Sequence, residues 1–190
     1  MTFPEYEDYD GLGLAALVSK GEVSAAELLE AAIERIEARD GELGAFVIRM
    51  YAAARSTVVA GLPSGPFTGV PFALKDLAVY SAGVPTTGGN RLFRDFVPDH
   101  DSAIVHRYRQ AGLVILGKTK TPELGASLTT EPLLYGPAHN PWNLDYSPGG
   151  SSGGSAEPLA ADEPGVAVEN VGPVDAVVTT IIDALVSNEP

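Results

Sequence analysis

Two glycine-rich segments hold the residue types in this 190-residue sequence that could do chemistry. One spans 147–156 and consists of serines and glycines with one proline and a final alanine. Dense glycine beside serine hydroxyls suits a site where the backbone must approach a reacting group closely. The same composition also suits a flexible linker. Spacing alone leaves both interpretations open, although Trp142 and the turn formers just upstream are unusual for a linker.

The other segment, 112–119, fits the pattern G-x-x-x-x-G-K-[ST] of a phosphate-binding loop. Such a loop needs flexible residues between its glycines, with their N–H groups turned towards the phosphate. Here the intervening residues form the continuous apolar run 113–116, which predicts a strand buried on both faces. Pro122 also weakens the helix that should follow. We therefore interpret this segment as a strand bounded by glycines.

The elements that must position these segments alternate between helix and strand, which indicates an α/β fold. A capping box at 24–27 should begin one helix, Gly41 should end it, and Asp101 should cap another. Short apolar runs predict strands, and the second of them leads directly into Lys75 and Asp76. Hydrophobic spacing predicts helices over 11–20, 24–41, 50–60 and 101–110, and strands over 46–48, 70–74 and 113–116.

The composition excludes several classes of site. The chain has 25 acidic and 12 basic residues, a net charge of -13, which disfavours binding to nucleic acid or to an anionic membrane. It has no cysteine, so disulfides and thiolate metal sites are excluded, and its three scattered histidines predict no zinc site. No leader or membrane-length apolar run stands out, which predicts a soluble, cytoplasmic protein.

The charge also divides the chain. Residues 1–156 have a net charge of -6, whereas 157–190 hold seven acidic residues and no lysine or arginine. This shift predicts a boundary near Ala156, between a domain at 1–156 and an acidic tail at 157–190. Within the tail, apolar residues on one helical face predict a C-terminal helix over 174–187.

A series of blocks in a fixed order gives the sequence a family resemblance. The blocks are 69–76, 86–90, 117–125, 135–137 with 140–142, and 149–156. Together they resemble the amidase signature family of serine hydrolases over residues 10–156. The resemblance implies the front part of that family's α/β/α fold, a mixed sheet flanked by helices. It also implies hydrolysis of a carbon–nitrogen amide bond in a small-molecule substrate, without metal or cofactor.

The resemblance further assigns roles to individual residues, because the family uses a Ser–cis-Ser–Lys triad. Lys75 matches the family's lysine, and burial at the end of its strand would favour the neutral amine that can act as a base. Ser151 matches the bridging serine, which passes a proton from the nucleophile to the lysine. Ser152 resembles a neighbouring serine that orders this network, and Gly149 and Gly150 support it.

The family's nucleophilic serine has no counterpart here. It should lie roughly two dozen residues after Ser151 in a block of the form G-[ST]-D-x-G-G-S, but the residue at that place is Asp175. Ser155 is disfavoured as a substitute because it lacks both the spacing and an oxyanion hole. Members of the family are also roughly two to three times as long. The nucleophile therefore stays unknown, and we expect this chain alone to be inactive.

Several interpretations remain open. The chain is a fragment of an amidase gene, one half of a split enzyme whose complementing chain supplies the nucleophile, or a non-catalytic pseudoenzyme that acts by interaction. Within the family, the block 121–125 and the acidic charge favour a general amidase over the amidotransferase A subunit that acts on aminoacyl-tRNA. An incomplete sheet would also expose apolar edges and favour self-association.

Overall fold

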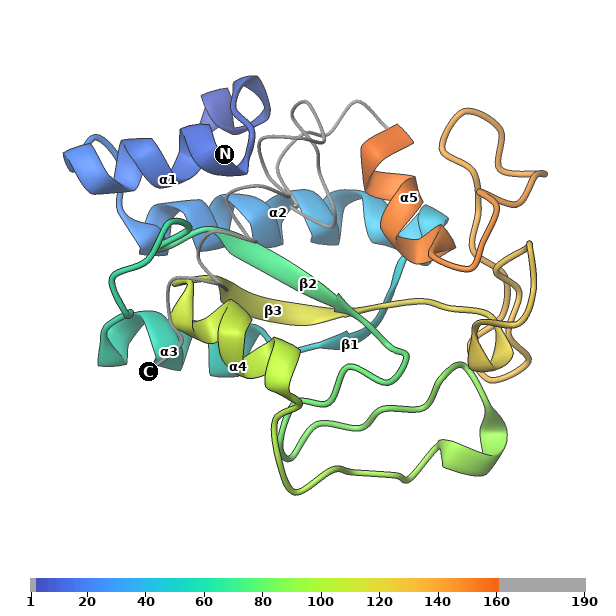
Figure 1. Cartoon of the computed structure of the whole chain (residues 1–190). Coiled ribbons are helices and arrows are strands. Elements are labelled where there is room, and N and C mark those ends of the chain that lie inside the picture. Colours follow the sequence, from blue (N-terminus) through green and yellow to red (C-terminus); the bar gives the residue numbers. More distant parts are fainter. Residues whose placement is uncertain (1–2, 161–190) are drawn as a thin grey trace.

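A computed structural model describes residues 3–160 of the chain (Figure 1). The predicted helix at 174–187 and the acidic tail beyond 160 lie outside the described residues. The helices are α1 (Gly11–Lys20), α2 (Ala25–Leu43), α3 (Tyr51–Ala60), α4 (Ala103–Gln110) and α5 (Gly153–Ala160), and the strands are β1 (Phe46–Arg49), β2 (Pro71–Lys75) and β3 (Val114–Thr119). Short 3₁₀ turns are η1 (Pro4–Asp8), η2 (Arg91–Phe93) and η3 (Glu123–Gly125).

The three strands form one mixed sheet with β3 in the centre, parallel to β2 and antiparallel to β1. Alternate residues of β3 face different helices, because successive side chains of a strand point to opposite faces. Val114 and Leu116 belong to the core shared with α1 and α2, whereas Ile115 packs with Val105 of α4. Helices therefore cover both faces of the sheet, which confirms the expected α/β class.

An irregularity in the β2–β3 pairing decides which side chains reach which face. The register shifts between Phe72 and Ala73, after which Leu74 pairs with Lys118 and Lys75 pairs with Thr119. Paired residues share a face, so Lys118 lies with Leu74 on the α4 side, and Lys75 lies with Thr119 on the other. Two lysines from neighbouring strand ends are thereby separated by the sheet.

Most predicted elements are confirmed, and the strand β3 removes the phosphate-loop interpretation of 112–119. The capping box is present: the Ser24 hydroxyl accepts from the Glu27 N–H, and the Glu27 carboxylate accepts from the Ser24 N–H. The predicted stop at Gly41 is wrong. The helix continues to Leu43, which completes its apolar face, and Gly44 ends it with φ 71°.

The predicted cap of α4 is also wrong. Asp101 does not cap the helix, which begins at Ala103 with Ser102 as its N-cap residue. The Asp101 carboxylate instead accepts hydrogen bonds from the Ala82 N–H at 2.7 Å and from Arg109 at 2.9 Å. A tertiary partner in the loop after β2 has thus replaced the local one.

The sequence did not predict α5, which runs through Ala156 to Ala160. Each helix in the described part of the chain is too short or too polar to cross a membrane.

Candidate active site

The centre of the site is the side chain of Lys75, the last residue of β2. Its Nζ lies 2.9 Å from the Ser151 hydroxyl oxygen and 2.9 Å from that of Ser152. The peptide bond between Gly150 and Ser151 is cis, as the family resemblance implies. The structure thus brings Lys75 into contact with two serines that lie 76 and 77 positions later in the sequence.

Lys75 is half-buried, whereas the sequence predicted a buried amine. The reason is the loop that packs against it. Ser151 and Ser152 are themselves partly exposed, so they leave the lysine's surroundings open on one side.

The glycine-rich segment is an ordered loop and not a flexible linker. The buried Thr130 holds it at two points, since its hydroxyl donates to the Gly149 carbonyl at 2.8 Å and accepts from the Gly153 N–H at 3.2 Å. The Thr121 hydroxyl donates to the Ser151 carbonyl at 3.1 Å. These contacts fix the backbone on both sides of the two serines.

Helix α5 begins where the chain must pass very close to the sheet. A Cβ atom on Gly154 would lie 2.5 Å from the Lys120 backbone nitrogen and 2.6 Å from the Ala45 carbonyl oxygen. Only glycine fits there, because neither backbone can move without disturbing the end of β3. The close approach brings the loop before α5, with Ser151 and Ser152, to the end of β2.

Replacing Gly154 with alanine is therefore expected to lower the free energy of unfolding by about 1–3 kcal/mol, the usual cost of overpacking. Urea denaturation measures this. Gly41→Ala is the matched control, because a Cβ there meets nothing within 4 Å. A helical alanine should leave that variant as stable as the parent, or slightly more so. Equal stability of both variants would contradict the tight packing.

The Ser155 side chain packs against the sheet. Its hydroxyl is 2.9 Å from the Thr119 hydroxyl, and the residue is only 5% exposed. The structure therefore gives this serine a packing contact with β3 and no open approach for a substrate.

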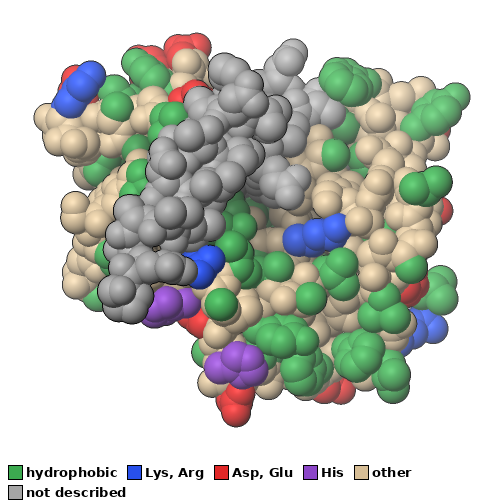
Figure 2. Space-filling model, viewed as in Figure 1, with side chains coloured by type: hydrophobic (Ala, Val, Ile, Leu, Met, Phe, Trp, Pro, Cys, Tyr) green, Lys and Arg blue, Asp and Glu red, His purple; other side chains and the backbone are tan. Residues whose placement is uncertain are grey.

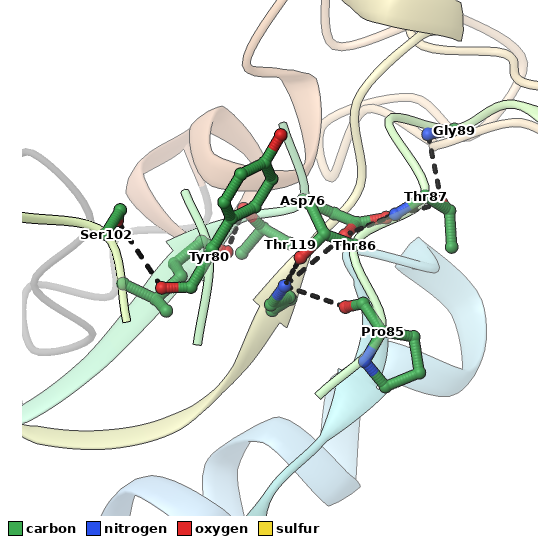
Figure 3. Close-up of polar contacts among 10 residues, drawn as sticks. Asp76, Tyr80, Pro85, Thr86, Thr87, Gly89, Ser102 and Thr119 are labelled. Carbon is green, nitrogen blue, oxygen red and sulfur yellow. Dashed lines mark hydrogen bonds and ion pairs between the residues drawn. The ribbon is translucent and has the colours of Figure 1, made fainter. Parts of the chain in front are cut away.

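Behind this site lies a polar cluster that the sequence did not predict (Figure 3). The Lys118 side chain is fully buried, and its Nζ donates to the Pro85 carbonyl at 2.7 Å and to the Thr86 hydroxyl. The same nitrogen lies 3.8 Å from a carboxylate oxygen of Asp76. Burial lowers the pKa of Lys118 to about 8, while the neighbouring carboxylate opposes this shift.

Asp76 is the acidic partner in the cluster. Its carboxylate accepts from the Thr87 N–H at 3.1 Å and from the Thr87 hydroxyl at 2.6 Å. Burial raises the pKa of Asp76, and the bonds from Thr87 together with the charge of Lys118 act against that rise. The one available signal in the sequence was a charged residue at the end of each of two neighbouring apolar runs, 70–74 and 113–116.

The pKa of Lys118 predicts a change of stability at alkaline pH. The unfolded lysine, with a pKa of 10.5, keeps its proton at pH values where the folded one has lost it. The unfolded state then binds more protons, so stability rises with pH, by up to about 2 kcal/mol between pH 8 and pH 10.

Urea midpoints across this range measure the gain. The gain should be missing in Lys118→Met, and its persistence there would contradict the assignment. Burial raises the pKa values of Tyr6 and Tyr51, so their opposite effect on stability belongs above about pH 10.

Metal-ligating side chains do not gather within residues 3–160, where no three histidines or carboxylates form a possible metal-binding group.

Comparison with known proteins places this geometry in a family. The Amidase family matches residues 27–168 of the chain, which is most of its length. The chain belongs to the amidase signature family. Its fold is confirmed as the front part of the architecture of that family.

The relatives within the amidase signature family show how much of such an enzyme this chain represents. The 6-aminohexanoate-cyclic-dimer hydrolase of Paenarthrobacter ureafaciens is 47% identical over 154 residues, covering 80% of this chain and 31% of the relative. The glutamyl-tRNA(Gln) amidotransferase A subunit of Salinispora arenicola (strain CNS-205) is 45% identical over 157 residues, covering 79% and 32%. The solved structure of 6-aminohexanoate cyclic dimer hydrolase complexed with substrate superposes with a TM-score of 0.77 at 44% identity, covering 85% of this chain and 33% of that one. The chain thus spans about a third of the length of the relatives it matches.

Proposed function

We propose that this chain provides the proton-accepting half of an amidase that hydrolyses carbon–nitrogen amide bonds. The observation that carries the proposal is the 2.9 Å contact between Lys75 Nζ and the Ser151 hydroxyl. A lysine held against two serines, at the end of a strand in an amidase signature fold, is suited to act as a base. Its role and that of Ser151 are assignments of this proposal.

The reaction uses this contact in its first step. Neutral Lys75 takes the proton of the Ser151 hydroxyl, which in turn takes the proton of the nucleophilic serine. That serine attacks the amide carbonyl carbon, and the carbon–nitrogen bond breaks as the leaving nitrogen receives the proton back. Water then hydrolyses the acyl-enzyme by the same relay. Ser152 provides a second hydrogen-bond partner that orients the lysine.

In this proposal the nucleophile is supplied by sequence outside these 190 residues, on the same polypeptide or on a second one. An exposed apolar surface supports this. Large hydrophobic side chains are exposed on the loops after β2 and β3, and Figure 2 shows hydrophobic side chains along the right and lower right of this face. The most exposed are Leu92, Leu128, Leu133 and Trp142, with 71–86% of their surface accessible. Large exposed apolar patches are typical of contact faces, and these loops carry several such side chains.

A chimaera tests the proposal directly. Residues 1–160 of this chain would replace the matching part of 6-aminohexanoate-cyclic-dimer hydrolase, which supplies the remainder of the fold. We expect the chimaera to hydrolyse amides and to lose this activity in Ser151→Ala. A folded chimaera whose turnover does not depend on Ser151 would refute the proposed relay.

The isolated 190-residue chain is expected to show negligible amide hydrolysis and no labelling by a fluorophosphonate probe, because the two hydroxyls that contact Lys75, those of Ser151 and Ser152, are assigned to the relay and to its orientation. Mass spectrometry of the labelled chain checks this. Strong labelling of Ser155 would overturn the view that this serine only packs, and would place the nucleophile within the chain.

A small-molecule amide is the substrate class that the charge favours. The net charge of -13 opposes binding to tRNA, so we place the chain with general amidases, without a bound metal or cofactor and in the cytoplasm. The amidotransferase A subunit remains the second candidate because one such protein is 45% identical over 157 residues. Stimulation of glutamine hydrolysis by tRNA in the corresponding chimaera would favour that candidate. A non-catalytic interaction protein would leave every chimaera inactive.

A further inference from the structure

The buried pair of Asp76 and Lys118 takes no part in the relay, yet it lies directly behind Lys75. We propose that Asp76 and Lys118 are positioning residues, which fix the loop 85–89 against the strand ends and thereby hold Lys75 at hydrogen-bonding distance from Ser151. This inference rests on the proposed function, since it concerns the geometry that the proton relay needs.

The backbone at the strand ends connects the pair to Lys75. Asp76 follows Lys75 directly, and its N–H donates to the Thr119 carbonyl at 3.0 Å, which extends the β2–β3 pairing by one residue. Lys118 pairs with Leu74 in the same ladder. The two charged residues therefore flank Lys75, one along its own strand and one on the neighbouring strand.

The pair also holds the segment 85–89 of the loop between β2 and α4. Lys118 holds its beginning through the Pro85 carbonyl and the Thr86 hydroxyl, and Asp76 holds its middle through both donors of Thr87. The Thr87 hydroxyl also accepts from the Gly89 N–H at 3.1 Å. The pair thus forms a compact hydrogen-bond network with this loop at the end of the sheet.

The same loop also supports the turn beside Ser151. The Gly88 carbonyl accepts from the Leu124 N–H at 2.7 Å. A Cβ atom on Gly125 would lie 3.8 Å from that of Ser151. The loop 85–89 therefore supports the turn 121–125, in which Thr121 bonds to the Ser151 carbonyl and Gly125 lies next to the Ser151 side chain.

A structural role alone explains the pair poorly. Buried ion pairs are often replaceable by apolar side chains without loss of stability, because desolvation offsets much of their attraction. In this cluster, each charged group instead directs hydrogen bonds to named atoms of one loop. This arrangement specifies a geometry, and that geometry is the one that brings Lys75 to Ser151.

The full chain provides a simple spectroscopic test, because it has only four lysines: Lys20, Lys75, Lys118 and Lys120. In ¹⁵N,¹³C-lysine-labelled protein, the exchange rate of the Lys75 ammonium protons and the pH titration of its Cε–Nζ group report on its hydrogen bonds. The double variant Asp76→Asn/Lys118→Met removes both charges. We expect the exchange rate of Lys75 to rise at least about tenfold, as loss of a hydrogen bond to a charged group predicts.

Two references calibrate this readout. Ser151→Ala gives the signature of the lost contact itself. Leu14→Ala removes a fully buried side chain of α1 and lowers stability, yet it should leave the Lys75 signals unchanged. If the double variant does not fold, Thr87→Val replaces it, since that change removes one bond to Asp76 and no charge. Unchanged Lys75 signals in folded Asp76, Lys118 or Thr87 variants would overturn the inference.

The outcome is separate from that of the proposed function. The measurement requires no turnover, so an inactive chimaera with a Lys75 signal that depends on Asp76 would count against the amidase proposal alone. An active chimaera whose Lys75 is insensitive to the pair would count against the positioning role alone.

Discussion

Replacing Lys75 with methionine in the active chimaera is expected to lower kcat/KM for amide hydrolysis by a factor on the order of 10⁴ or more. Methionine fills similar space but has no amine, so the group that accepts the proton of Ser151 in the proposed relay is lost. Most of the loss should appear in kcat, because the proton is transferred in the transition state and not on binding. Initial rates at several substrate concentrations separate the two constants.

Lys20 provides the matched control for this substitution. It lies at the end of α1 with 65% of its side chain exposed, and its ion pair with Glu22 is a surface contact of 3.9 Å. Lys20→Met should leave kcat/KM unchanged. A Lys75→Met chimaera that retains activity within about tenfold of the parent would remove this lysine from the reaction, since triad members rarely cost so little.

The residues of this proposed relay could be named from the sequence through the family resemblance, because each lies in a block that resembles one of that family. Lys75 ends an apolar run, and Ser151 and Ser152 lie among glycines. The positions of strands and helices followed from hydrophobic periodicity, because that pattern is local. The prediction that Lys75 is buried was wrong, because its exposure depends on how open the loop 147–152 is. That openness is a property of the assembled fold.

Helix α5 and the Asp76–Lys118 contact could not be predicted from local pattern. Glycine is a poor helix former, so Gly153 and Gly154 indicated a loop. They nevertheless begin a helix, because the chain here packs so closely against Thr130 and Lys120 that only glycine fits.

The charged pair joins residues 42 positions apart. It also depends on the irregular β2–β3 pairing, which turns Lys118 to the α4 side of the sheet. A one-residue change of register would have sent this lysine to the opposite face.

The Asp76–Lys118 contact predicts a second large effect, on the free energy of unfolding. Removing one partner of a buried ion pair leaves the other charge without compensation. Lys118→Met is expected to lower the free energy of unfolding by about 3–5 kcal/mol. The Asp76 carboxylate would keep its bonds from Thr87 but lose the only positive charge recorded beside it among the described residues. Urea denaturation of the full chain near neutral pH measures the loss.

The double variant decides between charge pairing and packing as the origin of this effect. Asp76→Asn/Lys118→Met removes both charges, so it should recover most of the stability that Lys118→Met alone has lost. The exposed Lys20–Glu22 pair is the reference, and Lys20→Met should change stability by less than about 1 kcal/mol. A double variant no more stable than Lys118→Met would show that the lysine acts through its apolar stem and its bonds to Pro85 and Thr86. In that case the carboxylate at position 76 would not be its energetic partner.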